Sequence, residues 1–135
     1  HAAIGLPHLS KSEQTSRTRR DACRTYNERL SGVPGVVVPK TDFTDVTPFL
    51  YYVRVPEEDR HALRKHLSER GIDTGIHWQP GHWFSLLKDF RAGDLSVTDQ
   101  VGKEILSLPL HSCMKAEDLH QVIDGIVSFF QEPRR

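Results

Sequence analysis

The last part of the chain carries its most regular apolar pattern, and this pattern decides what else the protein must contain. Apolar residues recur there at the spacing i, i+3, i+4, i+7, i+8 and i+11, which places them on one face of an α-helix. These residues are Leu119, Val122, Ile123, Ile126, Val127 and Phe130. A helix with such a face is stable only when another layer covers it. We therefore expect the final helix to pack on a core built by the rest of the 135 residues.

Local signals predict further helices along the chain. Pro7 lacks a backbone donor, so the helix-like start of the chain should break or kink near Leu6. Ser96 to Asp99 resembles a capping box, with Asp in place of the usual Glu, ahead of an amphipathic segment. The helices that we expect cover residues 12–30, 57–70, 82–87 and 97–105, besides the final helix.

Between these helices lie short runs rich in β-branched and aromatic residues, which are typical of strands. The strands that we expect cover residues 36–38, 49–55 and 72–78, with a short extended piece at 107–110. The alternation of helices and strands predicts an α+β fold, a small mixed or antiparallel sheet with helices on one face. The length fits a single domain over residues 1–135.

Charge and apolar runs exclude several classes of function. Lys+Arg and Asp+Glu both number 18, so the formal net charge is zero, whereas a nucleic-acid-binding protein normally has a basic excess. Five arginines in residues 17–29 are interpreted as a solvated helix face paired with Glu13, Asp21 and Glu28; a phosphate-binding stripe is the weaker alternative. No apolar run has the roughly 18–20 residues that a membrane span needs. Two cysteines without paired spacing predict reduced thiols in a cytoplasmic protein, with Cys113 buried.

The segment from His77 to Phe84 concentrates the chemistry-bearing side chains, with two histidines and both tryptophans. Loops at strand ends commonly carry binding residues, and an aromatic face beside an imidazole can hold a flat ring or a sugar. The alternative is an aromatic loop that packs on the core. No histidine or cysteine spacing matches a metal motif, and no lysine has the apolar surroundings of a Schiff-base amine. The candidate binding residues are His77, Trp78 and His82.

Several stretches in order along the chain resemble the C-terminal part of the DegT/DnrJ/StrS family of sugar aminotransferases. The first stretches are His1–Leu6, Arg19–Tyr26 and Gly35-Val36, and Tyr51–Val55 follows them; the later ones are Gly71–Trp78, Leu106–His111 and Met114–Glu117. The family usually has His followed by Tyr or Phe where this chain has His77-Trp78, which enlarges the aromatic face. The chain also begins without a methionine at a point where the family pattern is already under way.

This resemblance implies the small C-terminal domain of a fold type I enzyme that uses pyridoxal phosphate. Such enzymes transfer an amino group to a keto group of a nucleotide-linked sugar, generally as homodimers. By position, His77, Trp78 and His82 would contact that substrate. The family's Schiff-base lysine and phosphate-binding residues belong to the large N-terminal domain, so the 135 residues are expected to hold no cofactor and to be inactive alone. A stand-alone, non-catalytic binding or interaction module is the alternative function.

Overall fold

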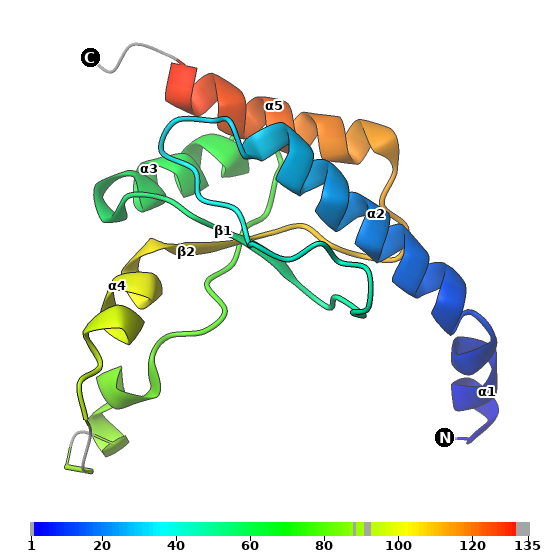
Figure 1. Ribbon diagram of the computed structural model, residues 1–135, viewed down its shortest axis with the longest axis horizontal. Coiled ribbons are helices and arrows are strands. Elements are labelled where there is room, and N and C mark those ends of the chain that lie inside the picture. The colour runs from blue at the N-terminus through cyan, green and yellow to red at the C-terminus, as the bar shows by residue number, and fades with distance from the viewer. Residues whose placement is uncertain (1, 88, 91–92, 132–135) are drawn as a thin grey trace.

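The centre of the molecule is a two-stranded antiparallel sheet, in a computed structural model that describes residues 2–87, 89–90 and 93–131. Strand β1 (Tyr51–Arg54) pairs with β2 (Ile105–Leu108), so that Tyr51 lies opposite Leu108. Three helices lie together on one side of the sheet (Figure 1): α2 (Ser12–Leu30), α3 (Glu57–Ser68) and α5 (Ala116–Gln131). The expected α+β fold with helices on one face is thus confirmed.

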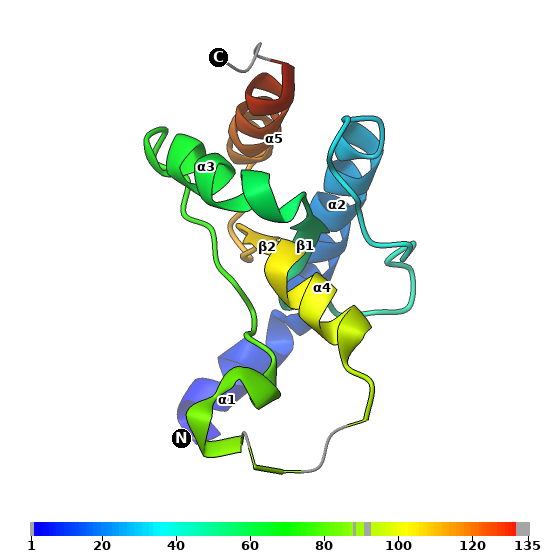
Figure 2. The same ribbon diagram turned by 90° about the vertical axis from the view of Figure 1, so that its left-hand side faces the viewer.

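The remaining elements extend away from this three-helix layer. They are α1 (Ala2–Ser10), α4 (Ser96–Glu104) and two 3-10 turns, η1 (Gly81–Trp83) and η2 (Ser85–Leu87). In Figure 1, α1 and the η1–η2 segment both project below the sheet, at opposite sides of the molecule. Figure 2, turned by 90°, shows the η1–η2 segment joined to α4 in front and α1 behind.

The core fills the space between the sheet and the three helices. Tyr26 of α2 and Tyr51 of β1 stack at its centre with ring centroids 4.8 Å apart, and the Tyr26 hydroxyl donates to the Pro109 carbonyl at 3.0 Å. Each fully buried Leu, Val or Ile contributes about 1.5–3 kcal/mol through the hydrophobic effect. The fully buried aliphatic residues are Leu30, Val53, Leu63, Leu67, Leu106, Ile123 and Ile126.

The helix predictions are confirmed except at the N-terminal break and at residues 82–87. Helix α1 continues through Pro7 and ends at Ser10, so of the two expected outcomes the break near Leu6 is wrong. Pro7 removes only one helical hydrogen bond, which the flanking turns tolerate. The chain leaves the helix at Lys11, where the hydroxyls of Ser10 and Ser12 bind the carbonyls of Pro7 and Leu9. Such side-chain hydrogen bonds compete with helix continuation. Residues 82–87 form the two short 3-10 turns η1 and η2 in place of one helix.

The strand predictions are partly wrong. The strand expected at 49–55 is present as the shorter β1, and the extended piece expected at 107–110 begins earlier, as β2. The segments 36–38 and 72–78 form only single bridges, Val37 with Arg54 and Gly75 with Ser107. A strand needs a partner over several residues, and each of these segments meets its neighbour at one point only.

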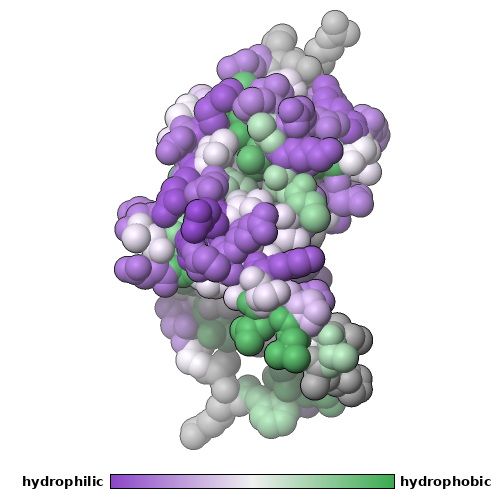
Figure 3. Space-filling view, turned by 90° about the vertical axis from the view of Figure 1, so that its right-hand side faces the viewer, coloured by the Kyte–Doolittle hydropathy of each residue, from purple (hydrophilic) through white to green (hydrophobic). Residues whose placement is uncertain are grey.

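The surface over α2 is mostly hydrophilic, whereas apolar side chains gather at the lower end of the molecule around α1 (Figure 3). There Leu6 and Leu9 are each 69% exposed. The arginines of α2 are paired as expected in three cases: Arg17 and Arg20 with Glu13, and Arg24 with Asp21. None of the described helices is long and apolar enough to cross a membrane.

The two cysteines lie in different environments, and both are free. Cys23 is fully buried in the core, where desolvation raises the pKa of its thiol to about 12 despite the nearby Arg19 charge. Cys113 is exposed, so the expectation that it is buried is wrong. It lies in the turn before α5, outside the buried core.

Candidate functional site

Two of the three candidate residues lie side by side in an exposed aromatic cluster. The Trp78 indole stacks on Phe49 with ring centroids 6.3 Å apart and an interplanar angle of 27°. The His77 imidazole meets the same indole edge-on, at 5.4 Å and 79°. Phe49 and Trp78 are each 67% exposed, although aromatic rings usually lie in the core. We call Phe49, His77 and Trp78 the aromatic cluster; it offers solvent two aromatic faces and an imidazole.

Part of the aromatic cluster borders a surface hollow of about 470 Å³. Phe49 and His77 line this hollow together with the polar side chains of Asp73, Thr74 and Ser107 and the apolar end of β2. A carboxylate and hydroxyl groups hydrogen-bond sugar hydroxyls, and aromatic rings stack on flat or apolar ligand faces. The buried hydroxyl oxygen of Ser107 has no hydrogen-bond partner among the described residues. The hollow thus has the chemistry to hold a polar, ring-containing ligand.

The His77 imidazole packs directly against Gly75. A Cβ atom at Gly75 would lie 2.8 Å from Nδ1 of His77 and closer still to Cε1. Gly75 also exchanges two backbone hydrogen bonds with Ser107 of β2, at 3.1 and 2.8 Å. The imidazole therefore rests directly on a glycine that the sheet holds in place.

The side chain of the third candidate, His82, contacts helix α4. Its Nε2 lies 2.7 Å from Oδ1 of Asp99, and the indole nitrogen of Trp83 donates to the same oxygen at 2.5 Å. The predicted capping box at Ser96 is therefore wrong, because the Asp99 carboxylate binds the η1 turn and Asp94 accepts from the Ser96 amide. These hydrogen bonds, from His82 first and Trp83 second, lower the pKa of Asp99.

Phe49 and Asp99 are the residues that the sequence analysis missed as parts of this region. The sequence pattern predicts Phe49 as the first apolar residue of a strand and Asp99 as part of a helix cap. No local signal reveals either of them, since Asp99 is 17 residues from His82 and Phe49 lies in a different loop from Trp78. The bridge of Gly75 with Ser107 places the segment that carries His77 and Trp78 beside β2.

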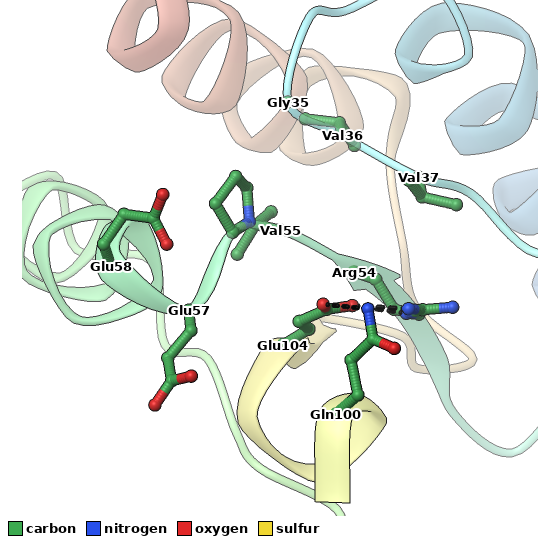
Figure 4. Close-up of a pocket in the computed structure, with 10 residues that line it drawn as sticks. Gly35, Val36, Val37, Arg54, Val55, Glu57, Glu58, Gln100 and Glu104 are labelled. Atoms are coloured by element: carbon green, nitrogen blue, oxygen red, sulfur yellow. Dashed lines mark hydrogen bonds and ion pairs between the residues drawn. The ribbon is translucent and has the colours of Figure 1, made fainter. Parts of the chain in front are cut away.

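A second hollow, of about 560 Å³, lies between residues 35–37, the start of α3 and α4 (Figure 4). Its one arginine, Arg54, donates from Nε and Nη2 to Oε2 of Glu104, at 2.8 and 2.5 Å. Gln100 donates to the other oxygen of that carboxylate. Burial raises the pKa of Glu104, but the hydrogen bonds from Gln100 and Arg54 and the Arg54 charge outweigh it, so the pKa is lowered.. This ion pair joins β1 to α4. Because Arg54 is already paired with Glu104, the described residues of the hollow offer no free cation to a ligand.

The described residues provide no metal centre, since nowhere in them do three His, Cys, Asp or Glu side chains converge. The lysines of the described part of the chain also fit no buried amine site. Lys11, Lys40, Lys65, Lys103 and Lys115 are all exposed, as expected from their polar contexts, and Lys88 lies outside the described residues. The side chains of the aromatic cluster and its hollow are therefore of the kind that hold a ligand by stacking and hydrogen bonds.

Comparison with known proteins gives one consistent result. A profile of the DegT/DnrJ/EryC1/StrS aminotransferase family matches residues 1–127. The aminotransferase TlmJ from Streptoalloteichus hindustanus is 28% identical, with a TM-score of 0.85 over 95% of this chain and 35% of that one. DesV from S. venezuelae, solved with a ketimine intermediate, is 28% identical, with a TM-score of 0.88 over 98% of this chain and 36% of that one.

A family aminotransferase from Brucella abortus is also 28% identical, with a TM-score of 0.80 over 94% of this chain and 34% of that one. This chain therefore spans about a third of the length of these solved structures, which it matches at 34–36% of their residues. The match of the family profile covers nearly the whole chain, and the fold agrees with it. The chain belongs to the DegT/DnrJ/EryC1/StrS aminotransferase family.

Proposed function

We propose that residues 1–135 form the C-terminal domain of a pyridoxal-phosphate-dependent aminotransferase that acts on nucleotide-linked keto sugars. The observation that carries the proposal is the family match over residues 1–127. In this proposal the protein works as a cytoplasmic homodimer. Membership of the family and the exposed aromatic cluster beside a polar hollow both favour this function over a non-catalytic binding module.

In the proposed enzyme, the aromatic cluster and the adjoining hollow contact the sugar nucleotide. The Trp78 indole, paired with Phe49 and His77, stacks its solvent-exposed surface on a ring of the substrate, because 67% of the residue is exposed. His77 is placed by Gly75 to hydrogen-bond a substrate oxygen. His82 contributes the edge of its ring that Asp99 does not occupy, since its side chain is still 27% exposed.

The described residues do not fit pyridoxal phosphate itself. Bound as a Schiff base, this cofactor needs a lysine whose amine is desolvated or otherwise activated, and every described lysine is exposed. We therefore assign the cofactor to residues beyond this chain, and we expect the chain alone to lack transaminase activity. This chain's contribution is to bind and orient substrate.

The test of the substrate role is Trp78→Ala in the full-length aminotransferase. Loss of an aromatic stacking partner with its buried area removes roughly 1.5 kcal/mol, so we expect sugar-nucleotide affinity to fall about tenfold. Phe90→Ala is the matched control, because Phe90 is also an exposed aromatic residue (71%) and lies outside the aromatic cluster. Unchanged affinity and turnover in Trp78→Ala would refute the substrate role of the cluster.

A second measurement tests the assignment of the cofactor. The purified chain is mixed with pyridoxal phosphate, and the absorbance band of an internal Schiff base is sought. We expect no specific band, and we expect transaminase activity only after the missing part of the enzyme is added. A band that maps to one lysine of this chain would contradict the proposal.

A further inference from the structure

One carboxylate of α4 holds two consecutive side chains of the η1 turn. Oδ1 of Asp99 accepts from the indole N–H of Trp83, which can only donate, and lies 2.7 Å from Nε2 of His82. Because an ionised carboxylate is an acceptor only, the His82 nitrogen that faces it carries the proton. The lowered pKa of Asp99 keeps this carboxylate ionised at neutral pH. We call Asp99, His82 and Trp83 the carboxylate clamp.

The η1 turn also packs closely against helix α4. A Cβ at Gly102 would lie 2.5 Å from Cγ of Pro80 and 3.1 Å from Cη2 of Trp83, so the turn rests directly on the helix backbone. Trp78 borders a small apolar hollow of about 260 Å³ on the same helix. The loop from Trp78 to Trp83 is therefore held on α4 at two points, the carboxylate clamp and the close packing against Gly102.

We propose that Asp99 is a positioning residue of the substrate loop. By accepting a hydrogen bond from the Nε2–H of His82, Asp99 fixes the imidazole tautomer and leaves Nδ1 as the acceptor for a substrate hydroxyl, as the second nitrogen of a histidine is set by the bond of the first. By binding Trp83, Asp99 also fixes the loop from which Trp78 projects. The inference rests on the proposed function, in which this loop contacts a sugar nucleotide.

The test compares Asp99→Ala and the isosteric Asp99→Asn with Asp99→Glu, which restores a carboxylate. Asp94→Ala is the matched control, because Asp94 lies just before the same helix and accepts from the Ser96 amide, away from His82 and Trp83. Nitrogen-15 NMR of the chain reports the His82 tautomer and the Trp83 indole proton, and titration of the full-length enzyme reports sugar-nucleotide affinity.

We expect the wild-type chain and Asp94→Ala to show the Nε2-protonated tautomer of His82 and a downfield Trp83 indole proton. Asp99→Ala should lose the fixed tautomer and shift the indole proton upfield, and Asp99→Asn, whose uncharged amide oxygen still accepts, should weaken both effects. Their affinity should fall about tenfold, the equivalent of one good hydrogen bond, with partial recovery in Asp99→Glu.

Unchanged His82 and Trp83 signals in both Asp99 variants would overturn the inference, and so would altered signals with unchanged affinity. Failure of the proposed function is a separate result, because it is seen in the wild-type enzyme as the absence of sugar-nucleotide turnover. The spectra of the chain decide the clamp in that case as well.

Discussion

Gly75→Ala is the substitution that most directly tests how this chain positions His77. The new Cβ would lie 2.8 Å from Nδ1 of His77. Non-bonded heavy atoms are most stable at about 3.5–4.0 Å, so Nδ1 must retreat by about 0.7 Å, and Cε1, which lies closer still, must retreat by more. The imidazole is the far end of a flexible side chain, whereas Gly75 is held by two hydrogen bonds to Ser107. The ring therefore moves and the backbone stays.

The stability of the fold should change little. Moving the His77 side chain off its preferred rotamer costs about 0.5–1.5 kcal/mol. An alanine reduces the conformational freedom of the unfolded chain, which returns about 0.4–1 kcal/mol, since the φ of Gly75 is outside the left-handed region. The net change in the free energy of unfolding should be within about 1 kcal/mol. Affinity should suffer more, because losing one hydrogen bond to the substrate lowers it up to about tenfold.

The assay is thermal unfolding of the chain together with sugar-nucleotide titration of the full-length enzyme. Gly32→Ala is the control, because a Cβ there meets nothing within 4 Å. We expect both variants to unfold near the wild-type temperature and only Gly75→Ala to bind more weakly. If Gly75→Ala left both the NMR signals of His77 and the affinity unchanged, the argument that Gly75 places the ring would be refuted.

Three further predictions concern the core and its surroundings. Gly102→Ala forces a methyl group against Pro80, and such overpacking should cost about 1–3 kcal/mol, seen as a lower Tm in calorimetry. Tyr26→Phe removes a hydrogen bond from a fully buried phenol, so urea unfolding should show a loss of about 1 kcal/mol; no loss would contradict the role of that bond. A thiol reagent should modify the exposed Cys113 rapidly and the buried Cys23 only on unfolding, as mass spectrometry of the labelled chain can show.

The helices could be predicted from the sequence far better than the strands. The apolar spacing of α5 and the acidic start of α3 are local signals, and both helices begin and run as such signals indicate. The segments 36–38 and 72–78 have the composition of strands but form only single bridges. A strand exists only where a partner runs beside it, and local composition does not say whether one does.

The candidate site divides in the same way. His77 and Trp78 were found from their neighbours in the chain, because aromatic and imidazole groups are concentrated there. Phe49 and Asp99 were not found, because each acts on a residue distant in the sequence. The sequence pattern assigns Asp99 to its own helix, since a carboxylate three residues after Ser96 also fits a cap. The Asp99 carboxylate can bind either its own helix or a distant loop. The fold decides between them by the donors that it brings near the carboxylate.

The sequence by itself determined the fold class, most of the helices and the loop that holds the candidate binding residues, because hydrophobic periodicity and residue type act over a few residues. Only the tertiary structure decided what those residues contact. It stacked Trp78 on Phe49, set His77 over Gly75 and gave the carboxylate of Asp99 to His82. These contacts depend on how loops distant in the chain approach one another across β1, β2 and α4, and this approach follows from the packing of the whole core.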